Sequence, residues 1–305
     1  MIRLIRAETA RLLSRPFTVI TMIVVVLAIG AFQLVVIDAF NRPAAEPVPA
    51  QTTDPGQPTE CQDPDVPAEE CTPAEDDGSG GGDVVRPPFA EVATLTLTVS
   101  IYLVALSTFM IAGSFIGAEF TSGSISNWLS FVPRRIPVFV SKLFTITVFS
   151  ALFSAACGAL TLGAAVVLAG IHDVPVEEIG KLMALGARGL IPAVALAAVG
   201  FCAGLLSRHT AAAIGVLLGY LFLWFVRNGP LSQLAWAQRL TPWTPEGNLS
   251  AVVGNGSTFE VVVDEQAYET VERHISLAHG IGYWVALIGV LAVVTGLVFR
   301  RRDVT

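Results

Sequence analysis

The sequence predicts an all-α integral membrane protein with six transmembrane helices. Of its 305 residues 53% are hydrophobic and only 14% are charged, whereas soluble domains carry about 25% charged residues. The mean hydropathy is +0.66, and the apolar residues are gathered into long blocks. A bilayer core about 30 Å thick requires roughly 20 apolar residues in a helix. Continuous blocks of that length favour helices over a β-barrel, whose strands alternate over about ten residues.

Six blocks of the sequence satisfy this length requirement. The third is long enough to tilt or to extend beyond the bilayer. Only residues 207–210 separate the fourth block from the fifth, which predicts a tight helical hairpin. The predicted spans are 17–40, 92–116, 138–168, 190–206, 211–226 and 281–299.

The first 15 residues are predicted to form an amphipathic helix that lies in the membrane interface. A cleaved signal peptide is not expected, because the apolar block that follows is long and no small-residue cleavage pattern ends it. The helix would direct its arginines toward lipid headgroups and its apolar side chains toward lipid. The apolar side chains are Ile2, Leu4, Ile5, Leu12 and Leu13, and the arginines are Arg3, Arg6, Arg11 and Arg15.

Charge asymmetry predicts a cell-membrane protein with both termini in the cytoplasm. In that orientation eleven of the eighteen Lys and Arg residues fall in short inside segments, as the positive-inside rule requires. Residues 41–88 carry eleven Asp and Glu residues against two Arg. The net charge of −7 therefore comes mostly from an exterior loop and gives no reason to expect a nucleic-acid partner.

The exterior segment 41–88 is rich in Pro, Gly and acidic residues. It lacks the apolar residues that would build a core, so most of it is expected to be disordered. Cys61 and Cys71 lie within it, and in an oxidising exterior they could form a short disulfide loop. The alternative is a pair of free thiols in a linker.

The second long exterior segment, 228–280, is more apolar. Its tryptophans and the valine run 261–263 predict short helices that re-enter the membrane or lie on its outer leaflet. Pro242 and Pro245 would interrupt these helices.

Motifs of catalysis and nucleotide binding are missing from the sequence. It contains no GxxxxGK[ST], no HExxH, no GxSxG and no Cys/His cluster with metal-ligand spacing. No enzyme activity, cofactor or metal is therefore expected in this chain. Charge is nearly absent from the spans, with Asp38 and Glu119 near span ends, so the sequence offers no ion-coupling relay. Energy for any transport would come from elsewhere.

The polar segment 117–142 separates the second span from the third and is predicted to face the cytoplasm. Within it, 124–131 would form a short helix that Pro133 ends, with Lys142 near the start of the third span. Hydroxyls of residues 121–124 would cap this helix at its N-terminus. Its apolar side would present Ile125, Trp128 and Leu129. The helix is either a knob that fits a partner's groove or an ordinary surface helix.

This pattern resembles the permease subunit of type-2 ABC exporters, in which a Glu-x-x-x-Gly-[Ser/Thr] element precedes a short coupling helix. Pro, basic residues and a Lys at the next span follow in that family. The ending FRRRDV at 299–304 is also similar to the family's basic-Asp finish, whereas the long acidic loop departs from the family pattern. The matching residues here are Glu119, Gly123, Ser124, Pro133, Arg134, Arg135 and Lys142.

The resemblance implies one permease domain over residues 1–305 and two kinds of partner. A separate ATPase subunit, holding ATP and Mg²⁺, would dock on the cytoplasmic side. A second permease chain, identical or related, would pair with this one in the bilayer. The residues that would couple to the ATPase are Glu119, Gly123, Ser124, Ile125, Asn127, Trp128, Leu129, Arg134 and Arg135.

Hydroxyls in the third span suggest a translocation path. Thr147, Ser150 and Ser154 share one helical face, although hydroxyls at such spacing also serve to pack helices together. A path so poor in charge would favour amphiphilic or apolar cargo, such as lipid-like molecules, drugs or peptides. The alternative function is a membrane anchor or sensor that transports nothing. An intramembrane enzyme is disfavoured because the spans hold no paired reactive residues.

Overall fold

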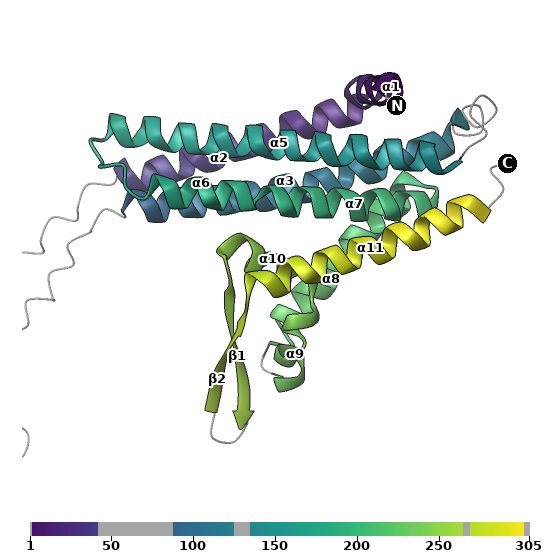
Figure 1. Cartoon of the computed structure of the whole chain (residues 1–305). Helices are drawn as coiled ribbons and strands as arrows, with labels where there is room; N and C mark the ends of the chain where they lie inside the picture. Colours follow the sequence, from purple (N-terminus) through teal and green to yellow (C-terminus); the bar gives the residue numbers. More distant parts are fainter. Residues whose placement is uncertain (1, 42–87, 125–134, 233, 265–268, 302–305) are drawn as a thin grey trace, which may run out of the picture.

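The structure, a computed structural model, describes residues 2–41, 88–124, 135–232, 234–264 and 269–301. In chain order the helices are α1 (Ile2–Leu13), α2 (Pro16–Asn41), α3 (Phe89–Thr121), α5 (Arg135–Ile171), α6 (Ile179–Arg188), α7 (Leu190–Ser207), α8 (Thr210–Asn228), α9 (Ala235–Arg239), the 3-10 turn η1 (Thr241–Trp243), α10 (Pro245–Gly254) and α11 (Leu277–Arg301). Strands β1 (Ser257–Asp264) and β2 (Glu269–Ile275) precede α11 (Figure 1).

Six helical segments in the described part of the chain are long and apolar enough to cross a membrane. They confirm six long apolar helices at the positions of the predicted spans, and most of them extend the predicted bounds by a few residues. Figure 1 shows α1 and the end of α11 at the same end of the bundle, where α3 ends and α5 begins. The six segments are Pro16–Val35, Phe89–Thr121, Ile136–Ile171, Ile179–Ser207, Thr210–Asn228 and Leu277–Arg300.

Helices α3 and α7 form the centre of the bundle, where their backbones approach closely at glycines. A Cβ added to Gly200 of α7 would lie 2.3 Å from the carbonyl oxygen of Phe109 in α3. One added to Gly204 would lie 2.6 Å from the carbonyl oxygen of Gly113. Small residues four apart allow this approach between membrane helices.

The fourth span differs from its prediction because α6 adds one further segment before α7. The sequence predicted a span beginning at Leu190, whereas the apolar helical segment begins at Ile179. Gly189 joins the two helices, and a Cβ there would lie 2.5 Å from Cγ1 of Ile101. The amphipathic α6 buries Leu182 and Leu185, so its apolar side is a packing face that a hydropathy block does not reveal.

The predicted tight hairpin at 207–210 is confirmed. Helix α7 ends at Ser207 and α8 begins at Thr210. Arg208 reverses the chain with a φ of 60°, in the left-handed region, and its amide donates a hydrogen bond to the carbonyl oxygen of Gly204. This single 5→1 bond is a usual way for a helix to end.

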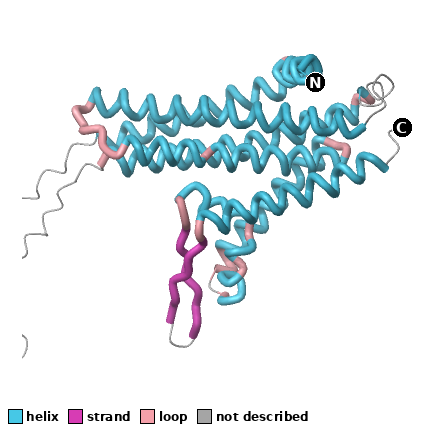
Figure 2. Tube along the Cα trace, viewed as in Figure 1, coloured by secondary structure: helices cyan, strands magenta, loops and turns pink. Residues whose placement is uncertain are grey.

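Segment 228–280 contains short helices, as predicted, in α9 and α10, but it also contains a β-hairpin that was not predicted. The valine run 261–263 lies in β1, and Val261 pairs with Val271 of β2 in an antiparallel register. Figure 2 shows the two strands side by side in magenta. β-branched residues favour the extended backbone. Asn255 and Gly256 both have positive φ and turn the chain out of α10. The prolines were placed more accurately, since Pro242 lies in η1 and Pro245 is the first residue of α10.

Helix α1 lies crosswise at the end of the bundle (Figure 1), and its residues Glu8 and Leu12 are fully buried. Leu12 was predicted to face lipid, but it is fully buried in the main core with Phe115 and Phe139. Leu13 is 46% exposed, as predicted. The prediction for Leu12 was wrong because a helical pattern shows that a face is apolar without showing what covers it. The side chains of residues 2–5 are outside the described set.

Candidate functional site: a buried ionic cluster of α1, α3 and α5

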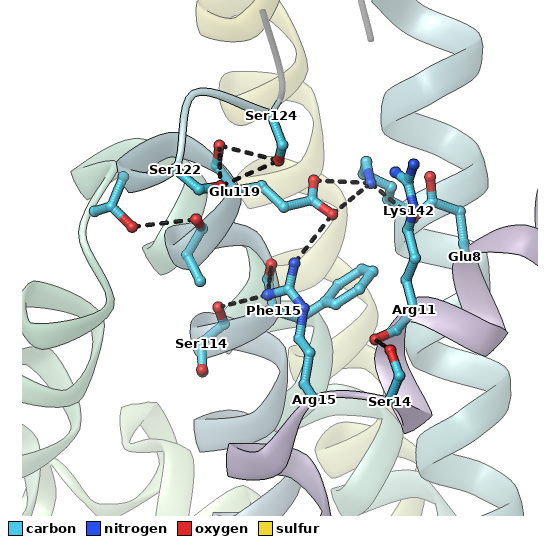
Figure 3. Close-up of polar contacts among 12 residues, drawn as sticks. Glu8, Arg11, Ser14, Arg15, Ser114, Phe115, Glu119, Ser122, Ser124 and Lys142 are labelled. Carbon is cyan, nitrogen blue, oxygen red and sulfur yellow. Dashed lines mark hydrogen bonds and ion pairs between the residues drawn. The ribbon is translucent and has the colours of Figure 1, made fainter. Parts of the chain in front are cut away.

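Four charged side chains meet where α1, α3 and α5 converge, and we call Glu8, Arg15, Glu119 and Lys142 the ionic cluster (Figure 3). Glu8 comes from α1, Arg15 from the turn before α2, Glu119 from the last turns of α3 and Lys142 from the start of α5. The chain therefore brings together residues up to 134 positions apart. Residues 125–134, which contain most of the predicted coupling helix, connect two of these elements.

Lys142 is the centre of the ionic cluster. Its Nζ lies 2.7 Å from Oε2 of Glu8 and 2.8 Å from Oε2 of Glu119. The side chain of Lys142 is only 2% exposed, and both carboxylates are equally buried. An isolated ammonium group is very costly to bury, so such a lysine is retained charged only with close partners.

Arg15 completes the ionic cluster from the other side of Glu119. Its Nη2 lies 3.3 Å from Oε1 of Glu119, and its Nη1 donates to the carbonyl oxygen of Phe115 at 2.7 Å. The guanidinium carbon lies 4.9 Å from the centroid of the Phe115 ring. Burial lowers the pKa of Arg15, and the carboxylates of Glu119 and Glu8 oppose that shift. Two cations and two carboxylates leave the ionic cluster with no net charge.

The turn after α3 ties its hydroxyls to the end of that helix. Ser122 and Ser124 donate hydrogen bonds to the carbonyl oxygen of Glu119 at 3.5 and 3.4 Å. Thr121 donates to the carbonyl oxygen of Ala118 at 3.1 Å. Gly123 has a φ of 68°, a conformation that glycine adopts without strain. These hydroxyls were predicted to cap the following helix, but the bonds described here satisfy carbonyls of α3.

Several predicted residues lie outside the described part of the chain. They include most of the predicted coupling helix and both cysteines of segment 41–88. Arg135 begins α5, but its side chain is not described. The residues outside the described set are Cys61, Cys71, Ile125, Asn127, Trp128, Leu129 and Arg134.

Sequence reasoning selected Glu119 and Lys142 but missed Glu8 as their partner. The available signal was that Glu8 is the sole acidic residue in 1–37, among four arginines. It also lies one helical turn from Leu12, on the face that the structure buries. A carboxylate on an otherwise apolar face indicates a contact with a buried cation.

The hydroxyls of the predicted path are bonded to backbone carbonyls. Thr147 donates to Phe144 at 2.9 Å and Ser150 to Ile146 at 2.8 Å, both within α5. Ser154 donates to the carbonyl oxygen of Gly189 at 3.3 Å, across to the α6–α7 junction. Ser150 and Ser154 are buried. The contact of Ser154 matches the packing alternative, and a translocation role stays a prediction.

A cavity of about 580 Å³, here the outer cavity, lies beside the end of α8 that is away from α7. Its wall is mainly apolar, with contributions from α3, α7, α8, α10 and α11. At its polar end Nη2 of Arg227 lies 2.6 Å from Oε1 of Glu246, and the Tyr220 hydroxyl also donates to Glu246. Nε1 of Trp284, which lines the cavity, is buried without a hydrogen-bond partner among the described residues.

No protein-family model matches this chain, and no curated protein is similar enough to be counted as a match. The class is therefore defined by the fold alone. The chain is a mainly helical protein whose described residues include six helices long and apolar enough for a multi-pass membrane protein.

Proposed function

We propose that this chain is the membrane-spanning subunit of an ATP-driven ABC exporter whose ATP is hydrolysed by a separate subunit. The ATPase would bind residues 124–131 from the cytoplasm, and a second permease chain would complete the transporter. The ionic cluster carries the proposal, because it joins α1 to the two helices, α3 and α5, between which that segment lies in the chain.

A coupling segment must transmit the movement of the ATPase to the membrane helices. A flexible loop between two independent helices would yield locally when a partner moved it. Here Lys142 holds the start of α5 to Glu119 at the end of α3 and to Glu8 of α1. Movement of the intervening segment would therefore displace these helices together. Buried charge at this position is otherwise hard to explain, because hydrophobic residues would pack there at less desolvation cost.

The outer cavity supports an amphiphilic cargo. Its volume falls within the range of about 300–1,000 Å³ that is typical of small-molecule sites. Apolar walls with a few polar groups at one end suit a molecule that has an apolar body and a polar head. Lipid-like molecules, drugs and peptides all fit this description.

The experiment is to co-purify the chain with a candidate ATPase and to replace Trp128 by Ala. We expect at least a tenfold loss of bound ATPase, because truncation of a central aromatic residue at an interface costs about 2 kcal/mol or more. The Glu119→Gln variant should retain more ATPase but lower its turnover, since it loosens the ionic cluster rather than the contact itself.

Trp243→Ala is the matched control, because Trp243 is an exposed tryptophan in the segment before α10. It should leave ATPase binding unchanged. Unaltered binding and turnover in both the Trp128 and Glu119 variants would favour the anchor or sensor instead. Orientation is tested separately with Ser126→Cys, which should react only with thiol reagents that reach the cytoplasmic side.

A further inference from the structure

A pocket of about 480 Å³, here the hairpin pocket, is formed jointly by the β-hairpin and the segment from α9 to η1. Two arginines from different elements border it, Arg239 at the end of α9 and Arg273 on β2. Both residues are exposed, so an occupant of the pocket can reach them. The other residues of the wall are Pro242, Trp243, Phe259 and Val261.

The hairpin pocket is positively charged, and no acidic residue is among the described residues of its wall. Neither Arg239 nor Arg273 has an ion-pair partner in the described part of the chain. Successive side chains of a strand point to opposite faces, which separates the charges of the hairpin. Arg273 is opposite Phe259 in the register, and both line the pocket. The next pair, Glu260 with Glu272, therefore lies on the other face.

The long apolar helices on either side of the hairpin pocket determine its position relative to a membrane. Segment Thr210–Asn228 precedes α9, and segment Leu277–Arg300 begins just after β2. Figure 1 shows α9 and the hairpin extending away from the bundle, across the long axis of its helices. Because spans cross the bilayer, elements that run across their axis at the span ends lie along the membrane surface. Trp236 and Trp243 are exposed there, and tryptophan is enriched at the level of lipid headgroups.

Charge and position together select the chemistry of an occupant. The planar guanidinium group of arginine binds phosphate oxygens through parallel N–H···O bonds, a geometry that lysine does not offer. Two arginines at the headgroup level therefore fit the phosphate of a lipid whose acyl chains remain in the bilayer. The same two charges repel the cationic group of a zwitterionic headgroup, so they favour an anionic lipid. Free phosphate would meet the arginines but would gain nothing from the exposed tryptophans.

We infer that the hairpin pocket binds the headgroup of an anionic phospholipid, with Arg239 and Arg273 donating hydrogen bonds to its phosphate. Trp243, on the rim, would lie beside the glycerol backbone of that lipid. The bound headgroup would join α9 to β2 and hold both elements at the membrane surface. The inference requires that the long apolar helices cross a membrane, but it is independent of the proposed ATP-driven transport and of the outer cavity.

The test uses the full chain in phosphatidylcholine nanodiscs that contain a small share of a phosphatidylglycerol probe with a photoreactive diazirine near its glycerol backbone. We expect crosslinks, located by mass spectrometry, on residues 239–243 and on β2. A phosphatidylcholine probe with the same diazirine should label these residues at least tenfold less. The double variant Arg239→Gln with Arg273→Gln should lower labelling by phosphatidylglycerol at least tenfold, because both charge-assisted contacts with the phosphate are lost. Each single substitution should lower it several-fold.

Lys181→Gln is the matched control, because it removes another cation whose side chain is 77% exposed but which pairs with Glu178 on α6. It should label like the unaltered chain, and gel filtration should show that all variants remain monodisperse. Equal labelling by the two probes, or labelling that survives all the arginine substitutions, would overturn the inference. Loss of labelling in millimolar inorganic phosphate would overturn it as well, because the pocket would then be a site for free anions.

Discussion

Replacing Lys142 by Met should destabilise the protein by about 3–5 kcal/mol, the usual cost of removing one partner from a buried ion pair. The change would leave the buried carboxylates of Glu8 and Glu119 with Arg15 as their remaining cation in the ionic cluster. Arg15 contacts Glu119 but not Glu8, so Glu8 would lose its described ion pair. Thermal unfolding in detergent, followed by the loss of the monodisperse gel-filtration peak, measures the effect.

Two further variants separate lost charge balance from lost packing. The combination of Lys142→Met with Glu8→Gln removes the uncompensated carboxylate and leaves Arg15 paired with Glu119, so it should recover much of the stability. Lys181→Met is the surface control, because Lys181 pairs with Glu178 but its side chain is 77% exposed. Such exposed pairs contribute about 0–1 kcal/mol. A Lys142→Met protein that unfolds like Lys181→Met would show that the ionic cluster has no structural importance.

The spans could be predicted from sequence because their signal is local. Twenty apolar residues in a row can hardly be anything other than a buried or membrane-spanning helix, and α2, α3, α5, α8 and α11 follow their blocks closely. Helix α6 was missed as part of the fourth span because it is amphipathic and contains Lys181 and Arg188. Its apolar side becomes informative only when α3 is known to cover it.

The β-hairpin of β1 and β2 shows a different limit of sequence reasoning. A short apolar run such as 261–263 fits a buried helix or a strand equally well by periodicity. Two features favour the strand for this run. Asn255 and Gly256 take positive φ in the turn before it, and a partner strand begins at Glu269. A strand exists only through its pairing, so a valine run alone could not distinguish the two.

The ionic cluster could be predicted from the sequence only in part. Glu119 and Lys142 could be selected because both fill places in the family pattern that segment 117–142 resembles. Their contact with each other depends on how α3 and α5 cross, and the contact with Glu8 depends on where α1 docks. Neither is encoded in spacing along the chain. The segment between Ser124 and Arg135 stays a prediction, since its contacts lie outside the described residues.

Replacing Gly200 by Ala should destabilise the bundle by about 1–3 kcal/mol, in spite of the higher helix propensity of alanine. The new methyl group would lie 2.3 Å from the carbonyl oxygen of Phe109 and 2.9 Å from its Cα. Both are backbone atoms of α3, so no side-chain rotation can relieve the contact. Helices α3 and α7 would have to separate along the centre of the core. Thermal unfolding in detergent measures the loss of stability, which should appear as a lower unfolding temperature.

The opposite result is expected for Gly219→Ala on α8, where the added Cβ meets no atom within 4 Å. That change should be neutral or stabilising by up to about 1 kcal/mol, because only the helix propensity changes. Gly204→Ala provides an independent check, since its Cβ would lie 2.6 Å from the carbonyl oxygen of Gly113 on the same helix face. If Gly200→Ala and Gly204→Ala behaved like Gly219→Ala, the α3–α7 contact could not be as close as described. The spans would then be held together mainly by their large apolar side chains, and small residues four apart would carry no packing information in this chain.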